Sequence, residues 1–352
     1  MADVARVAGV STSTVSHVLN ATRKVSEETE RAVREAIKAT GYTHDRIARS
    51  LATGKTRTIG LAMSAISNPY FAELAHAIER EAARDGYTLL LADTHDDPER
   101  ELRAISDLLG QRVDGVILAP SSQPSAVLEL LRRRGVPTVL IDRFLPVEFD
   151  QIGTENTAPT ARLIEHLAEL GHVRIGIIAG LEGLSTTDER IEGYRLGLAA
   201  AGIEFDSELV AHGKSDIEPA RAAAERLLAL ERPPTALVAT NNRMTIGVMR
   251  ALREAKLKVP EDVALVAFDD FEWADLFHPR LTTIAQSTKQ IGEQSVTMLL
   301  TRLANPGLFA RKVRLEPKFV HRESCGCGLA APGDGKLPEA ETGLAVPAGE
   351  GA

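Results

Sequence analysis

Two groups of polar residues in this sequence have types and spacing that could do chemistry. The first lies in VARVAGVSTSTVSHVLN, from Val4 to Asn20, where two short helical patterns flank a turn at Gly9. The polar face of the second pattern consists of Thr12, Ser13, Ser16 and His17. A short helix, a glycine turn and a second helix with a small polar face are typical of the helix-turn-helix, whose second helix can enter a DNA major groove. The alternative is a helical hairpin that packs on a larger domain.

Side chains that favour helix ends mark the limits of these helices. Ser11 stands where the second helix should be capped, because its hydroxyl can accept a hydrogen bond from an unpaired backbone N–H. Ser26 should open a third helix, which would stop at Gly41. The segment from residue 1 to residue 44 therefore reads as a small all-α unit.

The second polar group follows apolar, strand-like runs. From Thr58 onward these runs alternate with amphipathic helical stretches, and they read TIGLAM, TLLLAD, VDGVILAP, TVLID, RIGIIAG, TALVAT and VALVAF. Near-continuous apolar runs are expected for parallel strands that are covered on both faces. The alternation predicts a doubly wound α/β architecture, and its length favours two lobes over one sheet.

Ligands of such sheets bind outside the carboxyl ends of the strands, so the residues just after each run are candidates. We expect the binding residues to be Asn68, Tyr70, Phe71, Asp93, Arg143, Thr186, Arg190, Asn241, Asp269, Trp273 and Gln286. Carboxylates, amides and guanidinium groups supply fixed donors and acceptors for vicinal hydroxyls. Aromatic faces such as those of Phe71 and Trp273 could stack on a sugar ring. The pattern favours a sugar or polyol ligand.

Several of these residues also have a purely structural interpretation. Asn68 could belong to a turn, and Arg143 could form an internal ion pair with its neighbour Asp142. Arg190 and Asp269 could pair across a closed cleft. The sequence leaves these alternatives open.

Composition and charge exclude several classes of protein. Of the 352 residues, 44% are hydrophobic and 26% are charged, and no apolar run is long enough to span a membrane. The start shows no secretory signal, so we expect a cytoplasmic protein. The net charge of −8 divides into +4 for residues 1–57 and −12 for the remainder, which suits a protein that offers one end to a polyanion.

Motifs for catalysis and for metal binding are missing from the sequence. HExxH, GxxxxGK[ST] and GxSxG do not occur, so we expect no enzyme, no catalytic residues and no cofactor. Cys325 and Cys327 supply two thiols, whereas a structural zinc site needs four ligands, so we expect no metal site. A solute-binding protein of a sugar transporter remains the alternative function, although it would carry a signal sequence and no basic headpiece.

The helix-turn-helix stretch, with VSEETERAVREAIKATGY and ARSL after it, resembles the LacI/GalR family of bacterial transcription regulators. The resemblance runs from Asp3 to about Cys325, and STSTVSHVLN is especially similar to the recognition helix of the purine repressor. It implies a type I periplasmic-binding-protein-like core, similar to the ribose type, with a ligand cleft between two lobes. It further implies a repressor whose operator affinity responds to a small ligand. Leu184 stands where the purine repressor carries a base-binding arginine, which disfavours a purine ligand.

The same resemblance implies roles in DNA binding. We expect Thr12, Ser13 and His17 to read base edges, and Arg6 and Ser16 to contact phosphates.

A hinge should join the headpiece to the core. Residues 45–57 would form a hinge helix and linker that folds on operator DNA, because its helical pattern is too short to be stable alone. Ala48, Arg49 and Leu51 would face the minor groove, where Leu51 would open a base step.

We expect four parts along the chain. They are a headpiece (1–44), a hinge (45–57), a core (58–328) and a disordered tail (329–352) rich in Gly, Ala, Pro and Glu. The resemblance implies lobe crossings near 155, 285 and 312. The N-lobe would comprise 58–155 and 286–312, and the C-lobe 156–285 and 313–328. The tail lacks a heptad zipper, so we expect a homodimer on a near-palindromic double-stranded operator.

Overall fold

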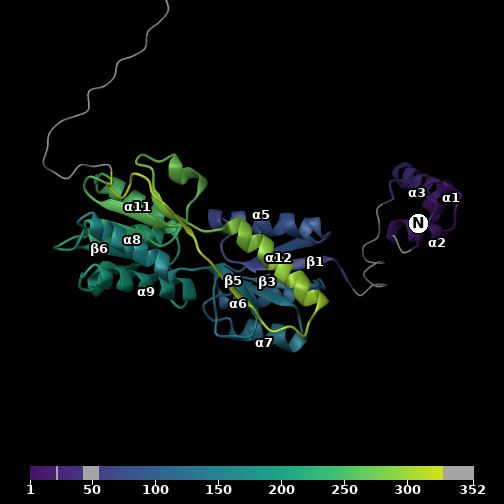
Figure 1. Ribbon diagram of the computed structural model, residues 1–352, viewed down its shortest axis with the longest axis horizontal. Coiled ribbons are helices and arrows are strands. Elements are labelled where there is room, and N and C mark those ends of the chain that lie inside the picture. The colour runs from purple at the N-terminus through teal and green to yellow at the C-terminus, as the bar shows by residue number, and fades with distance from the viewer. Residues whose placement is uncertain (21–22, 43–54, 328–352) are drawn as a thin grey trace, which may run out of the picture. The chain divides into compact units, whose positions relative to one another are not determined.

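The structure, a computed structural model, describes residues 1–20, 23–42 and 55–327 (Figure 1). It divides into two compact units between Arg57 and Thr58, and each unit has its own hydrophobic core. The expected hinge residues Ala48, Arg49 and Leu51 lie outside the described residues, as does the expected tail (329–352). None of the described helices is both long and apolar enough to cross a membrane.

The headpiece packs three short helices around a small core. They are α1 (Ala2–Ala8), α2 (Thr12–Asn20) and α3 (Glu27–Thr40). One valine from each helix is fully buried in a single apolar cluster. These residues are Val4, Val15 and Val33. Each helix has one apolar stripe, and the three stripes are buried only when the helices pack together.

The headpiece turn and its helix caps confirm the local predictions. Gly9 ends α1 at φ 66° and Gly41 ends α3 at φ 60°, in the left-handed region that favours glycine. The Ser11 and Ser26 hydroxyls each accept a hydrogen bond from the backbone N–H three residues later, at 3.1 and 3.3 Å. These contacts set the turn that presents the start of α2.

The N-lobe is a parallel six-stranded sheet with helices on both faces. Its strands, in spatial order, are β11 (Lys312–Leu315), β5 (Asp150–Thr154), β4 (Thr138–Ile141), β3 (Gly115–Leu118), β1 (Thr58–Met63) and β2 (Thr88–Asp93). The helices α5 (Pro69–Arg84) and α12 (Thr288–Ala304) share one apolar cluster with the sheet, and α6 (Pro98–Gly110) and α7 (Ser125–Arg134) share another. In Figure 1, α5 lies above the strands, α12 crosses in front of them, and α6 and α7 lie below.

The C-lobe repeats this architecture. Its strands, in spatial order, are β12 (Lys318–Val320), β10 (Thr282–Ala285), β9 (Ala264–Phe268), β8 (Ala236–Ala239), β6 (Ile175–Ala179) and β7 (Val210–His212). The pairing of β12 with β10 is antiparallel, and the others are parallel. The helices are α8 (Thr157–Glu169), α9 (Ser185–Ala200), α10 (Ile217–Leu228) and α11 (Asn242–Glu254), with the 3₁₀ turns η1 (Ser207–Leu209) and η2 (Glu272–Asp275).

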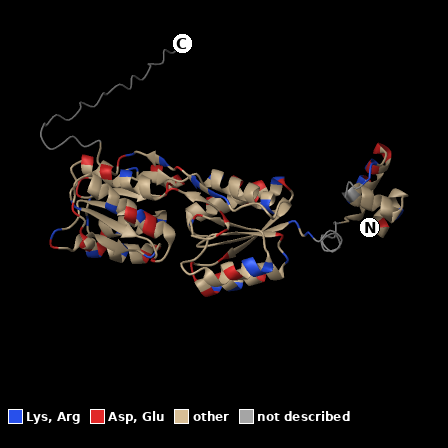
Figure 2. Ribbon diagram, turned by 60° about the horizontal axis from the view of Figure 1, so that its bottom comes forward, with Lys and Arg blue, Asp and Glu red and all other residues tan. Residues whose placement is uncertain are grey.

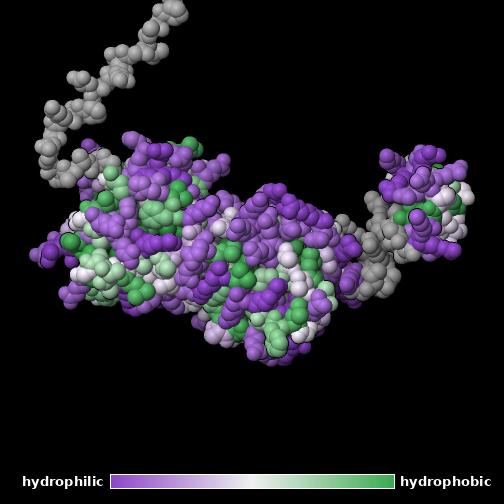
Figure 3. Space-filling model, viewed as in Figure 1, coloured by the Kyte–Doolittle hydropathy of each residue, from purple (hydrophilic) through white to green (hydrophobic). Residues whose placement is uncertain are grey.

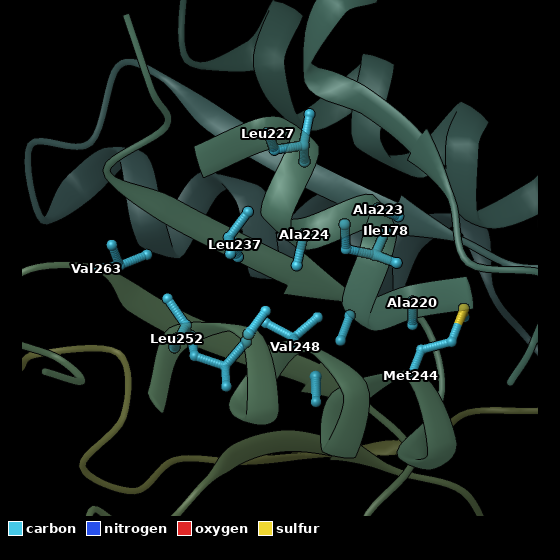
Figure 4. Packing of buried hydrophobic residues seen from close by; sticks show 14 of the residues in the cluster. Ile178, Ala220, Ala223, Ala224, Leu227, Leu237, Met244, Val248, Leu252 and Val263 are labelled. Carbon is cyan, nitrogen blue, oxygen red and sulfur yellow. The ribbon is translucent and has the colours of Figure 1, made fainter. Parts of the chain in front are cut away.

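Small side chains allow close helix packing on one face of the C-lobe sheet. Figure 4 shows Ala220, Ala223 and Ala224 of α10 beside Val248 of α11 and the sheet residue Leu237. Figure 2 shows acidic and basic residues mainly on helices and loops, and few on the strands. On the face seen in Figure 3, hydrophilic residues predominate, with smaller hydrophobic patches between them. The apolar side chains of each lobe therefore lie mostly between the sheet and the helices that cover it.

The chain passes between the lobes after β5, after β10 and between β11 and β12. The third crossing follows Leu315, a few residues later than the predicted position near 312, because β11 pairs with β5 of the N-lobe from Lys312 to Leu315. The N-lobe segment therefore continues to Leu315, and the C-lobe segment begins with β12. Charged and apolar residues alternate in KVRL, as they could in an edge strand of either sheet. The sequence therefore did not indicate which sheet this strand would join.

Candidate functional site

A polar cavity lies where the carboxyl ends of the strands of the two lobes meet. The N-lobe lines it with Ser64, Ala65, Asn68, Tyr70, Phe71, Asp96, Asp142 and Arg143. The C-lobe lines it with Gly180, Leu184, Thr186, Thr187, Arg190, Ser215, Thr240, Asn241 and Asp269, and Gln286 stands at the crossing. Nine of the eleven residues expected from the sequence are among them; the two exceptions are Asp93 and Trp273.

Asp93 and Trp273 do not line this cavity. The Asp93 carboxylate accepts backbone N–H bonds from Ala65 at 3.0 Å and from Ile66 at 3.1 Å, so it holds the loop after β1. Trp273 lies in η2, is 52% exposed and packs edge-on against Phe271. Because both residues follow a strand, the sequence placed them at the correct edge of the sheet. The sequence pattern could not show in which direction their side chains point.

Arg143 is the cationic centre of the N-lobe side. Its guanidinium group is buried, forms an ion pair with Asp96 and donates to the Pro120 carbonyl oxygen at 2.6 Å. Its Nε lies 3.3 Å from the Asp142 carboxylate, which also accepts the Tyr70 hydroxyl at 2.8 Å. The internal ion pair considered from the sequence is therefore present, within a larger network. Asp96 and Asp142 together raise the pKa of Arg143 despite burial, which opposes the charge.

Arg190 has the corresponding place on the C-lobe side. Its Nε donates to the Asn156 side chain at 3.0 Å, and its Nη1 donates to the Thr240 carbonyl oxygen. The guanidinium carbon lies 3.7 Å from the centre of the Phe268 ring, a cation–π contact. Arg190 and Asp269 both belong to the C-lobe, so a pair between them would not bridge the lobes. Arg190 is held rigidly by neutral groups.

Two aspartates occupy matching positions in the two lobes. Asp142 follows β4 and Asp269 follows β9, and both have positive φ, at 68° and 74°. Non-glycine residues pay a strain energy there, which is often found at binding sites. Burial raises the pKa of both carboxyl groups. Asp269 accepts the Gln286 amide at 2.6 Å, whereas the buried Gln286 Oε1 has no hydrogen-bond partner among the described residues.

Asn68 and Asn241 both cap helices that begin at the cavity. The Asn68 side-chain oxygen accepts the Tyr70 backbone N–H at 3.0 Å at the start of α5, and that of Asn241 accepts the Met244 N–H at 2.7 Å at the start of α11. The turn interpretation of Asn68 is therefore correct in part. Each amide still lines the cavity, where its remaining polar atoms can meet a ligand.

Sequence reasoning missed several lining residues. Asp96 and Ser215 each stand three residues beyond the end of a strand, in the loops after β2 and β7. A search restricted to the residues next to each strand could not find them. Reading the whole loop at the same sheet edge would have included both.

The residues that we expect to read DNA differ in their exposure. Thr12 and Ser13 are exposed at the start of α2, and Ser16 and His17 are half-buried one turn later. Arg6 on α1 is exposed and pairs with Asp3 at 3.2 Å. Such an exposed pair contributes little stability, so Arg6 can exchange this partner for a phosphate at low cost.

A helix-turn-helix unit followed by a two-lobed core with a polar cleft defines the class of ligand-responsive transcription regulators. Residues 1–45 match the family model of bacterial regulatory proteins of the lacI family, and residues 164–325 match that of a periplasmic binding protein-like domain. The chain belongs to the lacI family of bacterial regulatory proteins.

Similar proteins cover nearly the whole chain. The HTH-type transcriptional repressor PurR of Mannheimia succiniciproducens is 35% identical over 324 residues, which are 92% of this chain and 97% of that protein. The ribose operon repressor of Escherichia coli K12 is 36% identical over 327 residues, 92% of this chain and 99% of that protein. Both are regulators, so the chain is a transcription regulator and not an enzyme.

Two solved structures have the same architecture over 92% of this chain and 98% of theirs. The transcriptional regulator CelR–cellobiose complex is 31% identical with a TM-score of 0.72. The lac repressor dimer bound to operator and the anti-inducer ONPF is 28% identical with a TM-score of 0.82. The transporter alternative from the sequence finds no support among these relatives, which are regulators.

Proposed function

We propose that this chain is a cytoplasmic repressor that binds a near-palindromic operator as a homodimer and responds to a sugar or polyol in the interlobe cleft. The single observation that carries the ligand class is that two buried arginines, Arg143 and Arg190, line one cavity together with two buried aspartates, Asp142 and Asp269, whose pKa is raised. The names of a ribose operon repressor and of a cellobiose-bound regulator support the same class.

The chemistry of the cleft suits neutral, hydroxyl-rich ligands. Two guanidinium groups donate in fixed directions, and carboxyl and amide groups accept. Phe71, only 5% exposed, offers an apolar face for the C–H groups of a sugar ring. Leu184, 2% exposed, adds another apolar lining residue and no hydrogen bond for a purine edge. A sugar or polyol therefore satisfies more of the lining than a purine does.

On the DNA side, we infer that α2 enters the major groove. Thr12, Ser13 and His17 would read base edges, and Ser16 and Arg6 would contact phosphates. In this proposal the hinge helices of two protomers pair over the operator centre, where Ala48, Arg49 and Leu51 contact the minor groove.

The two sites must be coupled through one equilibrium. A ligand that closes the cleft changes the orientation of the two lobes relative to each other. The expected hinge precedes the N-lobe, whose first strand begins at Thr58. If the ligand binds one arrangement more tightly, it shifts the population towards that arrangement and alters operator affinity. The direction of the change decides whether the ligand is an inducer or a corepressor.

The test uses the full chain in two measurements. Fluorescence anisotropy with fragments upstream of its own gene and the adjacent genes should show binding that survives competitor DNA. Calorimetry with a panel of pentoses, hexoses, disaccharides, polyols and purine bases should then show binding for a member of the first four groups. Equal affinity for genomic and random duplexes would remove the regulator proposal. Binding of a purine alone would remove the ligand class while leaving DNA recognition intact.

A further inference from the structure

Four metal-ligating side chains converge at one edge of the C-lobe. They are His166 in the last turns of α8, and His321, Cys325 and Cys327 after β12. Their ligand atoms, two imidazole nitrogens and two sulfurs, all lie within 4.8 Å of one another. None of the four lines the interlobe cavity.

Three of the six separations between the ligand atoms are close to the edges of a metal-centred tetrahedron. Cys325 Sγ lies 3.4 Å from His321 Nε2 and 3.4 Å from Cys327 Sγ, and Cys327 Sγ lies 3.3 Å from His166 Nε2. Zinc bonds of roughly 2.3 Å to sulfur and 2.0–2.1 Å to nitrogen imply edges of roughly 3.3–3.8 Å. A disulfide would instead bring the two sulfurs to about 2.0 Å, and both cysteines are free.

The surroundings fix the ligands in place. The His166 and His321 rings meet edge to face at 5.3 Å, and both contact Phe319 of β12, His321 by stacking and His166 by its edge. Cys325 is fully buried, whereas Cys327 is exposed and could admit an ion from solvent. These ring contacts restrict the orientation of both imidazoles.

We propose that His166, His321, Cys325 and Cys327 bind one zinc ion in a closed, four-coordinate structural site. Two thiolates and two imidazoles suit zinc and exclude calcium and magnesium, which prefer oxygen ligands. With all four positions taken by side chains, the ion has no open position for a reacting molecule. The site was missed from the sequence because His321, Cys325 and Cys327 supply only three nearby ligands, and the fourth, His166, comes from a helix 161 residues away from Cys327.

The position of the site indicates what the ion does. Residues 321–327 follow the antiparallel edge strand β12, and α8 is the first helix after the chain enters the C-lobe. A metal bond between them ties the last described segment to the beginning of the lobe. Since zinc would bind the folded arrangement, where all four ligands meet, more tightly than the unfolded chain, it would stabilise the C-lobe by mass action.

The first experiment measures metal directly in the full-length protein. After removal of metal by a chelator under reducing conditions, the chain should take up one equivalent of zinc by elemental analysis. Cobalt(II) in place of zinc should give the visible bands of a tetrahedral ion and an ultraviolet thiolate-to-cobalt band. No uptake with both thiols free by thiol titration would overturn the proposal. Recovery of a Cys325–Cys327 disulfide from protein purified under reductant would overturn it as well.

Variants then assign the ligands. Loss of even an outer-shell partner commonly weakens metal binding by roughly 10- to 100-fold, so His321→Gln and Cys327→Ser should weaken zinc binding at least about tenfold. His321 and Cys327 are both exposed, so these variants should fold, which circular dichroism can verify. His76→Gln, an exposed histidine of α5, is the matched control and should bind like the unaltered chain.

Thermal unfolding supplies a second readout. Zinc should raise the unfolding temperature of the unaltered chain and of His76→Gln, and leave that of the Cys325→Ser/Cys327→Ser double variant unchanged. Zinc uptake at unaltered affinity by the double variant would show that the ion binds elsewhere and would overturn the assignment.

Discussion

At the scale of single residues, the cleft is defined by two arginines that buried acceptors hold in place. Arg190 is fixed by Asn156, the Thr240 carbonyl oxygen and the Phe268 ring, so its direction is set before a ligand arrives. Preorganised charge of this kind gives affinity at little ordering cost. The same argument applies to Arg143 between Asp96 and Asp142.

We predict that Arg190→Ala abolishes the effector response and leaves operator binding intact. The substitution removes the C-lobe's guanidinium donor and leaves buried acceptors without a partner. Effector calorimetry and operator anisotropy on the same preparation measure the two effects. Arg195→Ala, on the exposed side of α9, is the control and should keep effector affinity. Retained effector binding in Arg190→Ala would contradict the assigned role.

We also predict that the free energy of unfolding depends on pH in opposite directions for a buried and an exposed aspartate. Burial raises the pKa of Asp142, so the folded state holds its proton more tightly than the unfolded state does. Relative to Asp142→Asn, the free energy of unfolding of the unaltered chain should rise as the pH falls through the raised pKa towards about 3.9, the unfolded value. Urea unfolding between neutral and acidic pH measures the difference.

Asp216 supplies the control of opposite sign. Burial alone would raise its pKa, but hydrogen bonds from Arg243 and from the Ile217 N–H outweigh burial and lower it. The advantage of the unaltered chain over Asp216→Asn should therefore shrink as the pH falls below the unfolded value. Parallel trends for the two variants would contradict the reasoning.

At the scale of elements, close helix contacts make some glycines irreplaceable. A Cβ atom added to Gly193 of α9 would lie 2.3 Å from the Thr157 carbonyl oxygen and 2.7 Å from the Thr160 Cβ of α8. We predict that Gly193→Ala lowers the free energy of unfolding by about 1–3 kcal/mol, the usual cost of overpacking. Urea denaturation provides the measurement.

Gly110 at the end of α6 is the matched control for Gly193. A Cβ atom there would meet no heavy atom within 4 Å. Gly110→Ala should leave the free energy of unfolding unchanged or raise it by up to about 1 kcal/mol, because alanine reduces the entropy of the unfolded chain. Equal losses in the two variants would contradict the role assigned to the α8–α9 contact.

The hinge is the second element with a sharp prediction. Leu51→Ala should weaken specific operator binding by several-fold or more, since alanine is too small to wedge a base step, and should leave effector affinity nearly unchanged. Anisotropy and calorimetry measure the two quantities. The control is Leu276→Ala in the C-lobe, where the leucine is 78% exposed. This variant should change neither operator affinity nor effector affinity. Unchanged operator affinity in Leu51→Ala would remove the wedge from the proposed mechanism.

At the scale of the whole molecule, coupling between cleft and headpiece has to be reciprocal. If the effector changes operator affinity by some factor, typically about 5- to 150-fold, the operator must change effector affinity by the same factor. Measuring effector binding with and without saturating operator, and operator binding with and without effector, closes this cycle. Unequal factors would mean that a third state, such as a change of oligomeric state, takes part.

Local patterns in the sequence were sufficient for much of this architecture. The headpiece caps at Ser11 and Ser26 were correct because a cap depends on residues three positions apart. The seven predicted strands all occur, since each is an apolar run, and all of them except the edge strand β2 are buried between helices. Most cleft residues followed, because parallel strands bring their carboxyl ends to one edge.

We did not predict elements whose polar residues are buried and hydrogen-bonded to residues outside the element. Strand β5 reads DQIGT, yet Asp150 pairs with Arg302 at 2.9 Å and the fully buried Gln151 bonds to Leu145 and Val147. Arg302 comes from a distant part of the chain, and Leu145 and Val147 come from the loop just before the strand, so the strand looks polar in the sequence and is buried in the fold. Helix α12 was missed for a related reason: it lies against β3, β4 and β5 as well as α5, and its apolar positions do not form a clean stripe.

The sequence by itself determined the helix-turn-helix, the βα alternation and the sheet edge at which a ligand should bind, because these depend on spacing along the chain. Only the tertiary structure decided that Asp93 and Trp273 lie outside the cavity, which depends on side-chain direction. It alone brought His166 to His321 and the two cysteines, and so completed a set of four ligands. Contacts between distant segments require the packed lobe, and no local pattern encodes them.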